Sequence, residues 1–459
     1  MLRQQALAIW EAGVAAVASE RLVRNALRCD GRLLFVCGAA FDTKLLRKIV
    51  VVGAGKAGAG MAAAVEEVLG EELTDTKVTG WVNVPADCVR SLRKIHLHAA
   101  RPAGVNEPTE EGVFGTRRIW SAANCASPND LLIVLISGGG SALMPAPVAG
   151  ITLADKQAVT RFLMRSGATI QELNAVRKRL SMVKGGRLAR AASKAKAIFS
   201  LIISDVIGDP LDVIASGPTV EDAGTATEAL AILQRFGAHS PEVPESVFDE
   251  LRLEESFSLG QQRVANSRVE QLAYGVPPVV HNHVIGNNAT ALDAAASKAR
   301  ELGFTVMSLG SNNAGEAQAV GHEIAELCRQ IRDGQAVLKP PVCILSGGEP
   351  IVKLVPTDQP RKGGRNQEVA LAALLHLWHD SLDRIAILSG GTDGEDGPTN
   401  AAGAVIDENL RHTALAKSLD PAEFLAINNS YPFFEQTDGL LLTGPTHTNV
   451  MDLRVALIR

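Results

Sequence analysis

Residues 131–140 read LLIVLISGGG, an unbroken apolar run that ends in a serine and three glycines. Alanine-rich stretches with helical character separate this run from others of the same kind. Continuous apolar strands that alternate with helices indicate a parallel sheet covered on both faces. The sequence therefore predicts an open, doubly wound α/β architecture. The other runs are KIVVVG (48–53), KVTGWVNV (77–84), AIFSLIISD (197–205), HVIGNN (283–288), FTVMSLG (304–310), VCILSGG (342–348) and IAILSGG (385–391).

The composition is that of an ordinary globular protein with 459 residues, 46% of them apolar and 21% charged. This length suits two or three domains. The net charge of -5 gives no reason to expect nucleic acid or an anionic membrane surface as a partner. The apolar runs are strand-sized and too short to span a bilayer.

The six cysteines are scattered and form no C-x-x-C pair, which is typical of reduced intracellular thiols. We therefore expect a cytoplasmic protein. The amphipathic, arginine-bearing N-terminus leaves a mitochondrial address open, although a first helix of the folded domain is the simpler interpretation. The sequence does not fix the oligomeric state and leaves a homodimer open.

One segment interrupts the alternation of strands and helices. Residues 240–280 are richer in proline and charge and carry no strong buried strand. We place a domain boundary in the C-terminal half of this segment, which divides the chain into domains at 1–265 and 266–459.

The first glycine-rich strand end is VVGAGKAGAG, in which Gly53, Gly55 and Gly58 match G-x-G-x-x-G. This pattern is typical of a dinucleotide site, but it also suits any tight turn from a strand to a helix. NAD binding would favour an acidic residue at the end of the next strand, where Asn83 stands. Lys56, inside the turn, suits an anion such as a phosphate or a carboxylate. Both interpretations stay open at this point.

The second strand end is ISGGGSALM, residues 136–144. Consecutive glycines expose backbone N–H groups and admit the close approach of a ligand, which suits phosphates. The chain has no Walker A sequence. The candidate phosphate-binding residues here are Ser137, Gly138, Gly139, Gly140 and Ser141.

Carboxylates and one arginine follow three other strands. Asp205 ends a buried run, where a carboxylate can hold Mg²⁺, accept a proton or simply cap a turn. Glu349 follows the S-G-G at 346–348, and Arg365 in GGRNQE offers a planar fork for carboxylate or phosphate. Asp393 follows the S-G-G at 389–391, with a spacing that does not fit an EF-hand. Glu395 and Asp396 read as residues of a surface turn.

The stretch TIQELNAVRKRLSMVKGGRLA, residues 169–189, predicts a helix that ends at Gly185 and Gly186. Apolar residues form one stripe, and basic residues occupy other faces. A solvated basic face is a strong alternative to a ligand-binding role. The stripe consists of Leu173, Val176, Leu180 and Val183, and the polar positions are Asn174, Arg177, Lys178, Ser181 and Lys184.

Taken together, these strand ends offer glycine-rich anion sites, cations and carboxylates. Phosphoryl transfer requires this set of groups, because it depends on positioning and on cations that neutralise the transferred group. Hydride transfer requires little of it beyond a dinucleotide turn.

The motifs also occur in an order that resembles the class II glycerate kinases, the glycerate 2-kinase family whose C-terminal part is called the MOFRL domain. The resemblance runs from Lys48 to Asp452 and is strongest to the animal enzymes. It rests on VVGAGKAGAGMAAA, LISGGGSALMPAP, TIQELNAVRKRLSMVKGGRLA, LIISDVIGDPLDVIASGPT, ILSGGEP, GGRNQEVALA, LSGGTDGEDGPTNAAGA and TGPTHTNVMD.

The resemblance implies two α/β domains with the active site in the cleft between them. The larger, Rossmann-like domain would carry a parallel sheet, and the C-terminal domain a mixed sheet with the MOFRL segment at about 341–452. The implied reaction transfers the γ-phosphate of ATP to D-glycerate. The usual product is 2-phosphoglycerate, with 3-phosphoglycerate left open, and the pathway is serine or fructose breakdown.

The family's key residues map onto Lys56, Asp205, Arg365 and Asp393. We assign Asp205 as the base or a Mg²⁺ ligand. Lys56 and Arg365 would neutralise the glycerate carboxylate and the γ-phosphate. Asp393 would hold Mg²⁺ or the substrate hydroxyls together with Glu349. The expected ATP site comprises Gly53, Gly55, Ser137, Gly138, Gly139, Gly140, Ser141, Asn288, Gly347 and Gly348, and the expected glycerate site Lys56, Glu349, Arg365 and Asn366.

Two departures from the family pattern concern substrate details. His447 stands where the family usually has glycine, and residues 101–112 lack the GHPVPD form of bacterial members. Two other functions remain as alternatives: an NAD(P)H-dependent hydroxypyruvate or tartronate-semialdehyde reductase, and a non-catalytic sugar-acid-binding regulator.

Overall fold

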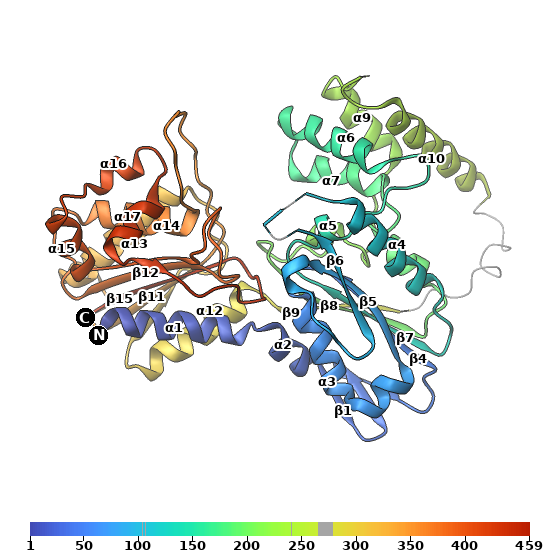
Figure 1. The fold of residues 1–459 in the computed structure, drawn as a ribbon, viewed down its shortest axis with the longest axis horizontal. Coiled ribbons are helices and arrows are strands. Elements are labelled where there is room, and N and C mark those ends of the chain that lie inside the picture. The colour runs from blue at the N-terminus through green and yellow to red at the C-terminus, as the bar shows by residue number, and fades with distance from the viewer. Residues whose placement is uncertain (103, 106, 240, 265–278) are drawn as a thin grey trace. The chain divides into compact units, whose positions relative to one another are not determined.

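The computed structural model describes residues 1–459 except 103, 106, 240 and 265–278. The chain forms two compact units (Figure 1). The predicted domain boundary between residues 265 and 266 lies outside the described residues. Unit 1 consists of Met1–Ala18, Ser204–Gly208 and Gly286–Arg459, and unit 2 of Ser19–Ile203 and Asp209–Ile285.

Unit 2 contains a six-stranded sheet in the order β6-β5-β4-β7-β8-β9. The strand pairs β4–β5, β4–β7, β5–β6 and β7–β8 are parallel, which confirms the predicted parallel sheet. Every residue of β7 and β8 is buried, which explains why both read as unbroken apolar runs. The strands are β4 (Lys48–Ala54), β5 (Val78–Pro85), β6 (Ile95–Arg101), β7 (Asp130–Ile136), β8 (Ala197–Ile203) and β9 (Val280–Gly286).

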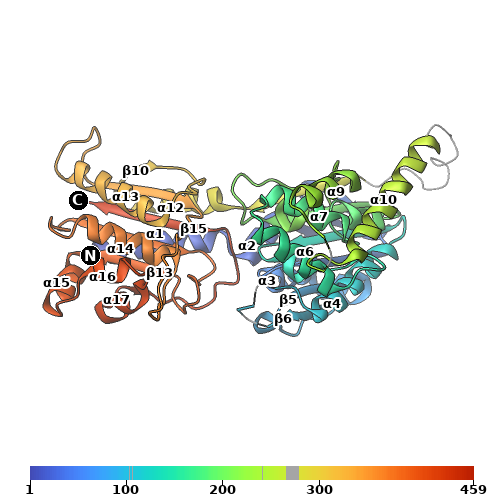
Figure 2. The ribbon, with the colours of Figure 1, turned by 90° about the horizontal axis from the view of Figure 1, so that it is seen from above.

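The helices of unit 2 fall into two groups. α3 (Gly58–Lys77) and α4 (Glu110–Asn124) pack on the sheet. Four others share a separate hydrophobic core, and Figures 1 and 2 show α6, α7 and α9 lying together. The four are α6 (Leu153–Arg165), α7 (Ile170–Arg179), α9 (Ala226–Arg235) and α10 (Glu245–Val264). The remaining elements of unit 2 are α2 (Ser19–Ala26), β1 (Leu27–Asp30), β2 (Leu33–Val36), β3 (Ala39–Asp42), α5 (Gly140–Leu143) and α8 (Arg187–Ala191).

The predicted helix over residues 169–189 is shorter than expected. It begins with a Thr169–Glu172 capping box, but α7 ends at Arg179, six residues before Gly185. After Arg179 the backbone leaves the helix and pairs with another segment. Met182 N donates to Ala146 O at 2.9 Å, and Ser181 forms an isolated β-bridge with Pro147. These backbone contacts replace the last turns of the helix and redirect Lys184.

Unit 1 contains a six-stranded mixed sheet in the order β10-β11-β15-β12-β13-β14, as predicted for the C-terminal domain. β15 is antiparallel to both of its neighbours, β11 and β12, so these two strands run in the same direction. The strands are β10 (Thr305–Ser308), β11 (Val342–Gly348), β12 (Ile385–Gly391), β13 (Gly403–Asp407), β14 (Leu440–Leu441) and β15 (Asp452–Ile458).

The strand register explains why S-G-G occurs twice in this unit. Gly348 and Gly391 both lie opposite Asp452, at the start of β15. Ser346 and Ser389 both lie opposite Arg454. The two motifs therefore flank the same residues of one central strand, and their carboxyl ends meet at one edge of the sheet.

Helices cover both faces of this sheet (Figure 1). α1 (Leu2–Ala16) and α12 (Asn288–Glu301) form one core with β11, β12 and β15. α13 (Ala317–Arg332) and α14 (Arg365–His376) belong to the core on the opposite face. The small helices α15 (Glu408–Ala416), α16 (Pro421–Leu425) and α17 (Ser430–Thr437) complete the unit.

Two glycines of G-x-G-x-x-G allow β4 and α3 to pack closely against neighbouring strands. A Cβ on Gly53 would lie 2.0 Å from the carbonyl oxygen of Leu135 on β7. A Cβ on Gly58 would lie 2.9 Å from a methyl group of Val82 on β5. The pattern is therefore explained by packing within the sheet, which favours the tight-turn interpretation.

We predict that Gly53→Ala destabilises the protein by about 2 kcal/mol or more, because the new methyl group overlaps backbone that cannot move without breaking the β4–β7 ladder. The free energy of unfolding in urea measures this effect. Gly315→Ala is the control, since its Cβ would meet only side-chain atoms, the nearest at 3.3 Å. Equal losses for the two variants would contradict the packing argument.

Candidate active site

In unit 2, the two glycine-rich strand ends lie against each other. Lys56 N donates to the carbonyl oxygen of Gly138 at 2.9 Å, and Ala57 N donates to Ser137 Oγ at 3.0 Å. A Cβ on Gly139 would lie 3.7 Å from Lys56 Cγ, so the Lys56 side chain runs beside this glycine. The structure thus brings together the lysine and the glycine loop that the sequence suggested separately.

Ser141, at the end of this loop, is surrounded by cations. Lys184 Nζ donates to Ser141 Oγ and, at 3.3 Å, to Ser141 O. Arg177 Nη2 also donates to Ser141 Oγ, at 2.8 Å. Ser216 joins the cluster, with its hydroxyl 3.3 Å from that of Ser141. The arrangement concentrates positive charge where the sequence predicted a phosphate site.

The basic residues of this region do not form a solvated face, so that alternative is wrong for Lys178 and Lys184. Lys178 is 5% exposed and pairs with Asp222 at 3.0 Å, and Lys184 is 2% exposed. Burial lowers the pKa of Lys184 well below its ordinary range, and Arg177 and Lys156 lower it further. Lys184 is buried because the chain leaves the helix at Arg179.

Lys156 is a buried cation that sequence reasoning missed. Its Nζ has no hydrogen-bond partner among the residues that the structure describes. Burial lowers its pKa to about 7, with contributions from the charges of Arg177 and Arg187. The only signal in the sequence is a lysine at an apolar-periodic position of α6, next to Val159 and Phe162.

Asn83, the residue that bears on NAD binding, has a structural role. Its Nδ2 donates to the carbonyl oxygen of Leu143 at 2.8 Å, and its Oδ1 accepts from Trp81 Nε1 at 3.2 Å. The side chain is fully buried. It therefore fixes the backbone at the end of α5, and this observation gives no support to a ribose site at that position.

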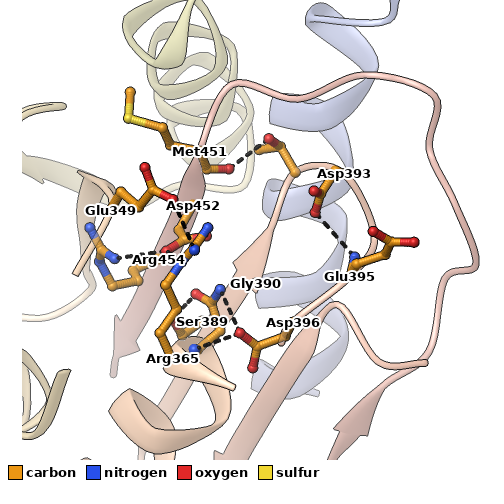
Figure 3. A network of polar contacts seen from close by, with 12 residues as sticks. Glu349, Arg365, Ser389, Gly390, Asp393, Glu395, Asp396, Met451, Asp452 and Arg454 are labelled. Carbon is orange, nitrogen blue, oxygen red and sulfur yellow. Dashed lines mark hydrogen bonds and ion pairs between the residues drawn. The ribbon is translucent and has the colours of Figure 1, made fainter. Parts of the chain in front are cut away.

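In unit 1, Arg365 holds two carboxylates at the strand ends (Figure 3). Its Nε and Nη2 donate to the two oxygens of Asp452, at 2.7 and 3.0 Å. Its Nη1 lies 2.9 Å from Glu349 Oε1. Partial burial raises the pKa of Glu349, Arg365 opposes this, and Asp452 and Asp393 raise it further. The cluster thus has more acidic groups than its arginine neutralises.

Asp452 and Arg454 are central to this site and were not predicted from the sequence. Asp452 is fully buried, and Arg454 is 1% exposed with its Nε 3.3 Å from Ser346 Oγ. Burial lowers the pKa of Arg454 to about 10. Two charged residues alternating at the start of the apolar strand DLRVALI are the signal that could have identified them.

Asp396 is not part of a surface turn, and this prediction is wrong. The residue is 2% exposed, and its carboxylate accepts from the backbone N–H groups of Asn366 and Gln367, at 3.0 and 2.9 Å. It therefore caps the first turn of α14. Burial raises its pKa to about 7, against the effect of the two N–H groups. The prediction failed because the cap joins positions thirty residues apart.

Asp393 follows β12 and is half-buried, whereas Glu395 is exposed, as predicted for a surface turn. Asp393 Oδ1 accepts from Glu395 N at 3.1 Å (Figure 3). Asp393 O accepts from Thr446 N at 3.1 Å. A Cβ on Gly391 would lie 3.1 Å from Asp393 Oδ1 and 3.6 Å from an oxygen of Asp452. The Asp393 carboxylate thus lies at the same strand ends as Asp452.

Other predicted residues take mainly structural positions, and their proposed ligand contacts stay predictions. Asn288 is buried, and its Nδ2 donates to the carbonyl oxygens of Val450 and Asp452, both at 2.8 Å. Gly347 makes room for it, because a Cβ there would lie 1.7 Å from Asn288 Oδ1. Asn366 Oδ1 accepts from Ser389 Oγ at 2.6 Å.

Asp205 lies two residues after β8 and belongs by its contacts to unit 1. It is half-buried. His447 is exposed and has a φ of 57°, in the left-handed region that favours glycine. This backbone conformation gives a physical reason for the glycine that the family usually has at this position.

A pocket of about 530 Å³ lies beside Arg365 within unit 1. Its walls combine apolar side chains with a few polar groups, and its size suits a small-molecule ligand. The lining includes Ile207, Glu349, Ile351, Leu354, Arg365, Glu368 and Asn428.

No group of three or more His, Cys, Asp or Glu residues is arranged to hold a metal ion in the part of the chain that the structure describes.

Comparisons with known proteins agree with this fold and these motifs. A family model described as a domain of unknown function (DUF4147) matches residues 5–252, and the MOFRL family model matches residues 342–452. The glycerate kinase of Danio rerio is 39% identical over 100% of this chain and 98% of its own length. The chain belongs to the class II glycerate kinases.

Two further relatives bear on structure and function. A crystal structure of glycerate kinase from Thermotoga maritima matches with a TM-score of 0.83 and 34% identity, covering 100% of this chain and 99% of that one. A protein of Agrobacterium vitis named putative hydroxypyruvate reductase is 40% identical over 90% of this chain and 99% of its own length.

Within the described residues, no helix is long and apolar enough to cross a membrane.

We predict that Asp452→Asn lowers the free energy of unfolding by about 3 kcal/mol or more, because it leaves Arg365 next to a neutral group in a buried position. Glu349→Gln is the matched control, since its side chain is 45% exposed, and it should cost less than about 1 kcal/mol. Urea denaturation measures both. A loss for Glu349→Gln as large as that for Asp452→Asn would refute the ranking.

We also predict that stability rises with pH above about pH 7, in part through Lys156. The folded chain releases the Lys156 proton near pH 7, whereas the unfolded chain holds it up to the ordinary pKa of 10.5. Between these values the unfolded state binds more protons, so each pH unit adds at most about 1.4 kcal/mol.

Lys156→Met should reduce this slope when the free energy of unfolding is measured at a series of pH values. The exposed Lys194 provides the control, and Lys194→Met should keep the wild-type slope. An unchanged slope in Lys156→Met would show that this lysine stays protonated in the folded chain.

Proposed function

We propose that this chain is an ATP-dependent glycerate kinase that transfers the γ-phosphate of ATP to D-glycerate, with 2-phosphoglycerate as the product. The observation that carries this proposal is the match to glycerate kinases along the whole chain. It is supported by the charged side chains and glycine-rich loops at the strand ends of both units.

The glycine loop of unit 2 would bind phosphates of ATP. Gly138, Gly139 and Gly140 leave the backbone accessible, and Ser141 adds a hydroxyl between two cations. Lys56 runs beside this loop and would neutralise charge on the transferred group, which is the main requirement of phosphoryl transfer.

Arg365 would bind an oxyanion of the substrates. Its contacts with Asp452 and Glu349 leave a second N–H on both Nη1 and Nη2. The ion pair with buried Asp452 fixes the plane of the guanidinium group, so these N–H groups have a defined direction. The adjacent pocket of about 530 Å³ has room for a three-carbon acid.

Asp205 is assigned as the base that accepts the proton of the glycerate hydroxyl, and Asp393 as a ligand of Mg²⁺ together with nucleotide phosphates. Kinases hold Mg²⁺ through one or two carboxylates plus phosphates, so a cluster of three acidic side chains is not needed. The surplus of carboxylate at Glu349, Asp393 and Asp452 fits a divalent cation. Such a cation would neutralise charge on the transferred phosphoryl group.

The reductase alternative has one observation in its favour, the name of the Agrobacterium vitis relative. The geometry of this chain favours the kinase. The glycines of G-x-G-x-x-G are needed for packing, and Asn83 is occupied by contacts inside the protein.

The six cysteines are free thiols, which supports a reducing compartment such as the cytoplasm.

The decisive experiment supplies the purified protein with ATP, Mg²⁺ and D-glycerate and identifies the product by ³¹P NMR. We expect a phosphate monoester at the 2-position and stoichiometric ADP. A parallel reaction contains NADH or NADPH with hydroxypyruvate. Oxidation of the nicotinamide without any ADP release from the first mixture would replace the kinase by the reductase.

We predict that Asp205→Asn lowers kcat by about 100-fold or more, because the amide cannot accept the hydroxyl proton. Asp209→Asn is the matched control, since this residue lies in the same segment and its φ of 54° is one that asparagine tolerates. It should keep kcat within a few-fold of wild type. A kcat of Asp205→Asn near that of Asp209→Asn would remove Asp205 from the role of base.

A further inference from the structure

Three buried or partly buried cations of unit 2 come from separate parts of the chain, and two of them, Arg177 and Lys184, donate to Ser141. Lys156 lies on α6, Arg177 on α7, and Lys184 on the turn that follows α7. Lys156 and Lys184 are 8% and 2% exposed. α6 and α7 contribute to one hydrophobic core, which holds the helices of Lys156 and Arg177 together. The charge of Arg177 lowers the pKa of both lysines, and the charge of Lys156 lowers the pKa of Lys184 further, so the three side chains lie within range of one another's charges.

These cations differ from their neighbours in lacking acidic partners. Lys178 and Arg179 both pair with Asp222, and Arg187 pairs with Glu254. Lys184 and Arg177, in contrast, donate only to hydroxyl and carbonyl oxygens among the described residues.

Lys156 is the extreme case, because its Nζ is nine-tenths or more buried and has no partner in the described part of the chain. A buried amine without a partner costs stability. The ion pairs of Lys178, Arg179 and Arg187 show that acidic residues are available in this region. The unpaired cations are therefore arranged to receive a negative charge that the described part of the chain does not supply.

The position of the cluster indicates where that charge would bind. Ser141 is half-buried and directly follows the glycine loop, and Gly139 and Arg177 are also partly exposed. An anion that reached Ser141 from the loop would meet Arg177 and Lys184 first, both of which already donate to the Ser141 hydroxyl.

We propose that Lys156, Arg177 and Lys184 bind a phosphoryl group beside Ser141. This inference rests on the proposed function for the identity of the ligand, which is either a phosphate of the nucleotide or the phosphate of the phosphorylated product. A tetrahedral anion with several acceptor oxygens can accept from all three side chains at once, whereas a single serine hydroxyl cannot. Binding would also favour the protonated form of both lysines.

The test compares wild type with Lys156→Met and with Lys178→Met, its matched control. Both variants replace a buried lysine of the same region by an apolar side chain of similar length, but only Lys178 has an acidic partner. Isothermal titration with ADP, and separately with 2-phosphoglycerate, gives Kd for each protein. Thermal unfolding with and without inorganic phosphate gives the stabilisation that the anion provides.

For Lys156→Met we expect an unliganded Tm equal to or above that of wild type, because an unpartnered amine is removed. We expect its Kd to weaken about 10-fold or more for at least one phosphorylated ligand. Lys178→Met should have a lower Tm and wild-type affinity. If Lys178→Met does not fold, Lys194→Met takes its place as the affinity control.

The two titrations identify the source of the phosphoryl group. A loss confined to ADP assigns the site to the nucleotide, and a loss confined to 2-phosphoglycerate assigns it to the product. Wild-type affinity of Lys156→Met for both ligands, with undiminished stabilisation by phosphate, would overturn the proposal. A wild-type protein without kinase turnover would refute the proposed function alone, because the phosphate titration does not depend on it.

Discussion

The carboxylate of Asp452 is the point on which the geometry of unit 1 depends. It is fully buried at the start of the central strand, between Gly348 and Gly391, and it holds Arg365 through two hydrogen bonds. Neither glycine has room for a side chain, because a Cβ on Gly348 would lie 2.3 Å from the carbonyl oxygen of Asn313 and one on Gly391 would lie 2.7 Å from that of Glu395. Because Arg365 is the first residue of α14, the same ion pair fixes where that helix begins relative to the sheet. The buried Asp396 carboxylate then caps the same helix by accepting from the backbone N–H groups of the next two residues, Asn366 and Gln367.

The two units treat charge in different ways, and both fit phosphoryl transfer. Unit 1 places Glu349 and Asp452 against Arg365, with Arg454 buried beside Asp452, which suits a cation and one oriented oxyanion. Unit 2 buries Lys156 and Lys184 without acidic partners among the described residues, and Lys184 contacts Ser141 at the end of the glycine loop, which suits an anion. Each arrangement costs stability in the unliganded protein and gains it when ligands bind. Binding energy that compensates such charges is available for positioning the reacting groups.

The fold was largely predictable because buried parallel strands leave a clear pattern in the sequence. The run at 131–136 becomes β7 with every residue buried, and the S-G-G stretches do mark strand ends. Lys56, Arg365 and Asp393 could be selected because each follows or accompanies such a strand end. Local patterns carry this information, since a strand and its terminal glycines are contiguous in the chain.

What the sequence did not predict depends on contacts between distant segments. The sequence suggests a surface position for Asp396, but α14 places two backbone N–H groups beside its carboxylate. The sequence also suggests a solvated position for Lys184, but the helix ends at Arg179. The only local sign that Lys156 is buried is its place at an apolar-periodic position of α6. Asp452 and Arg454 interrupt the apolar pattern of the last strand, and this interruption is visible in the sequence. It indicates a site only when the strand register is known, because the register places both S-G-G motifs beside these two residues.

We propose above all that the strand ends of this chain bind the phosphates of a nucleotide, from which one phosphoryl group is transferred to D-glycerate. A crystal structure of the protein with ADP and Mg²⁺ tests it most directly. We predict a phosphate within hydrogen-bond distance of Ser141 or of the backbone at Gly138 to Gly140, with Lys184 and Arg177 among its partners. Phosphates bound away from this loop, with the cations around Ser141 unchanged, would contradict it.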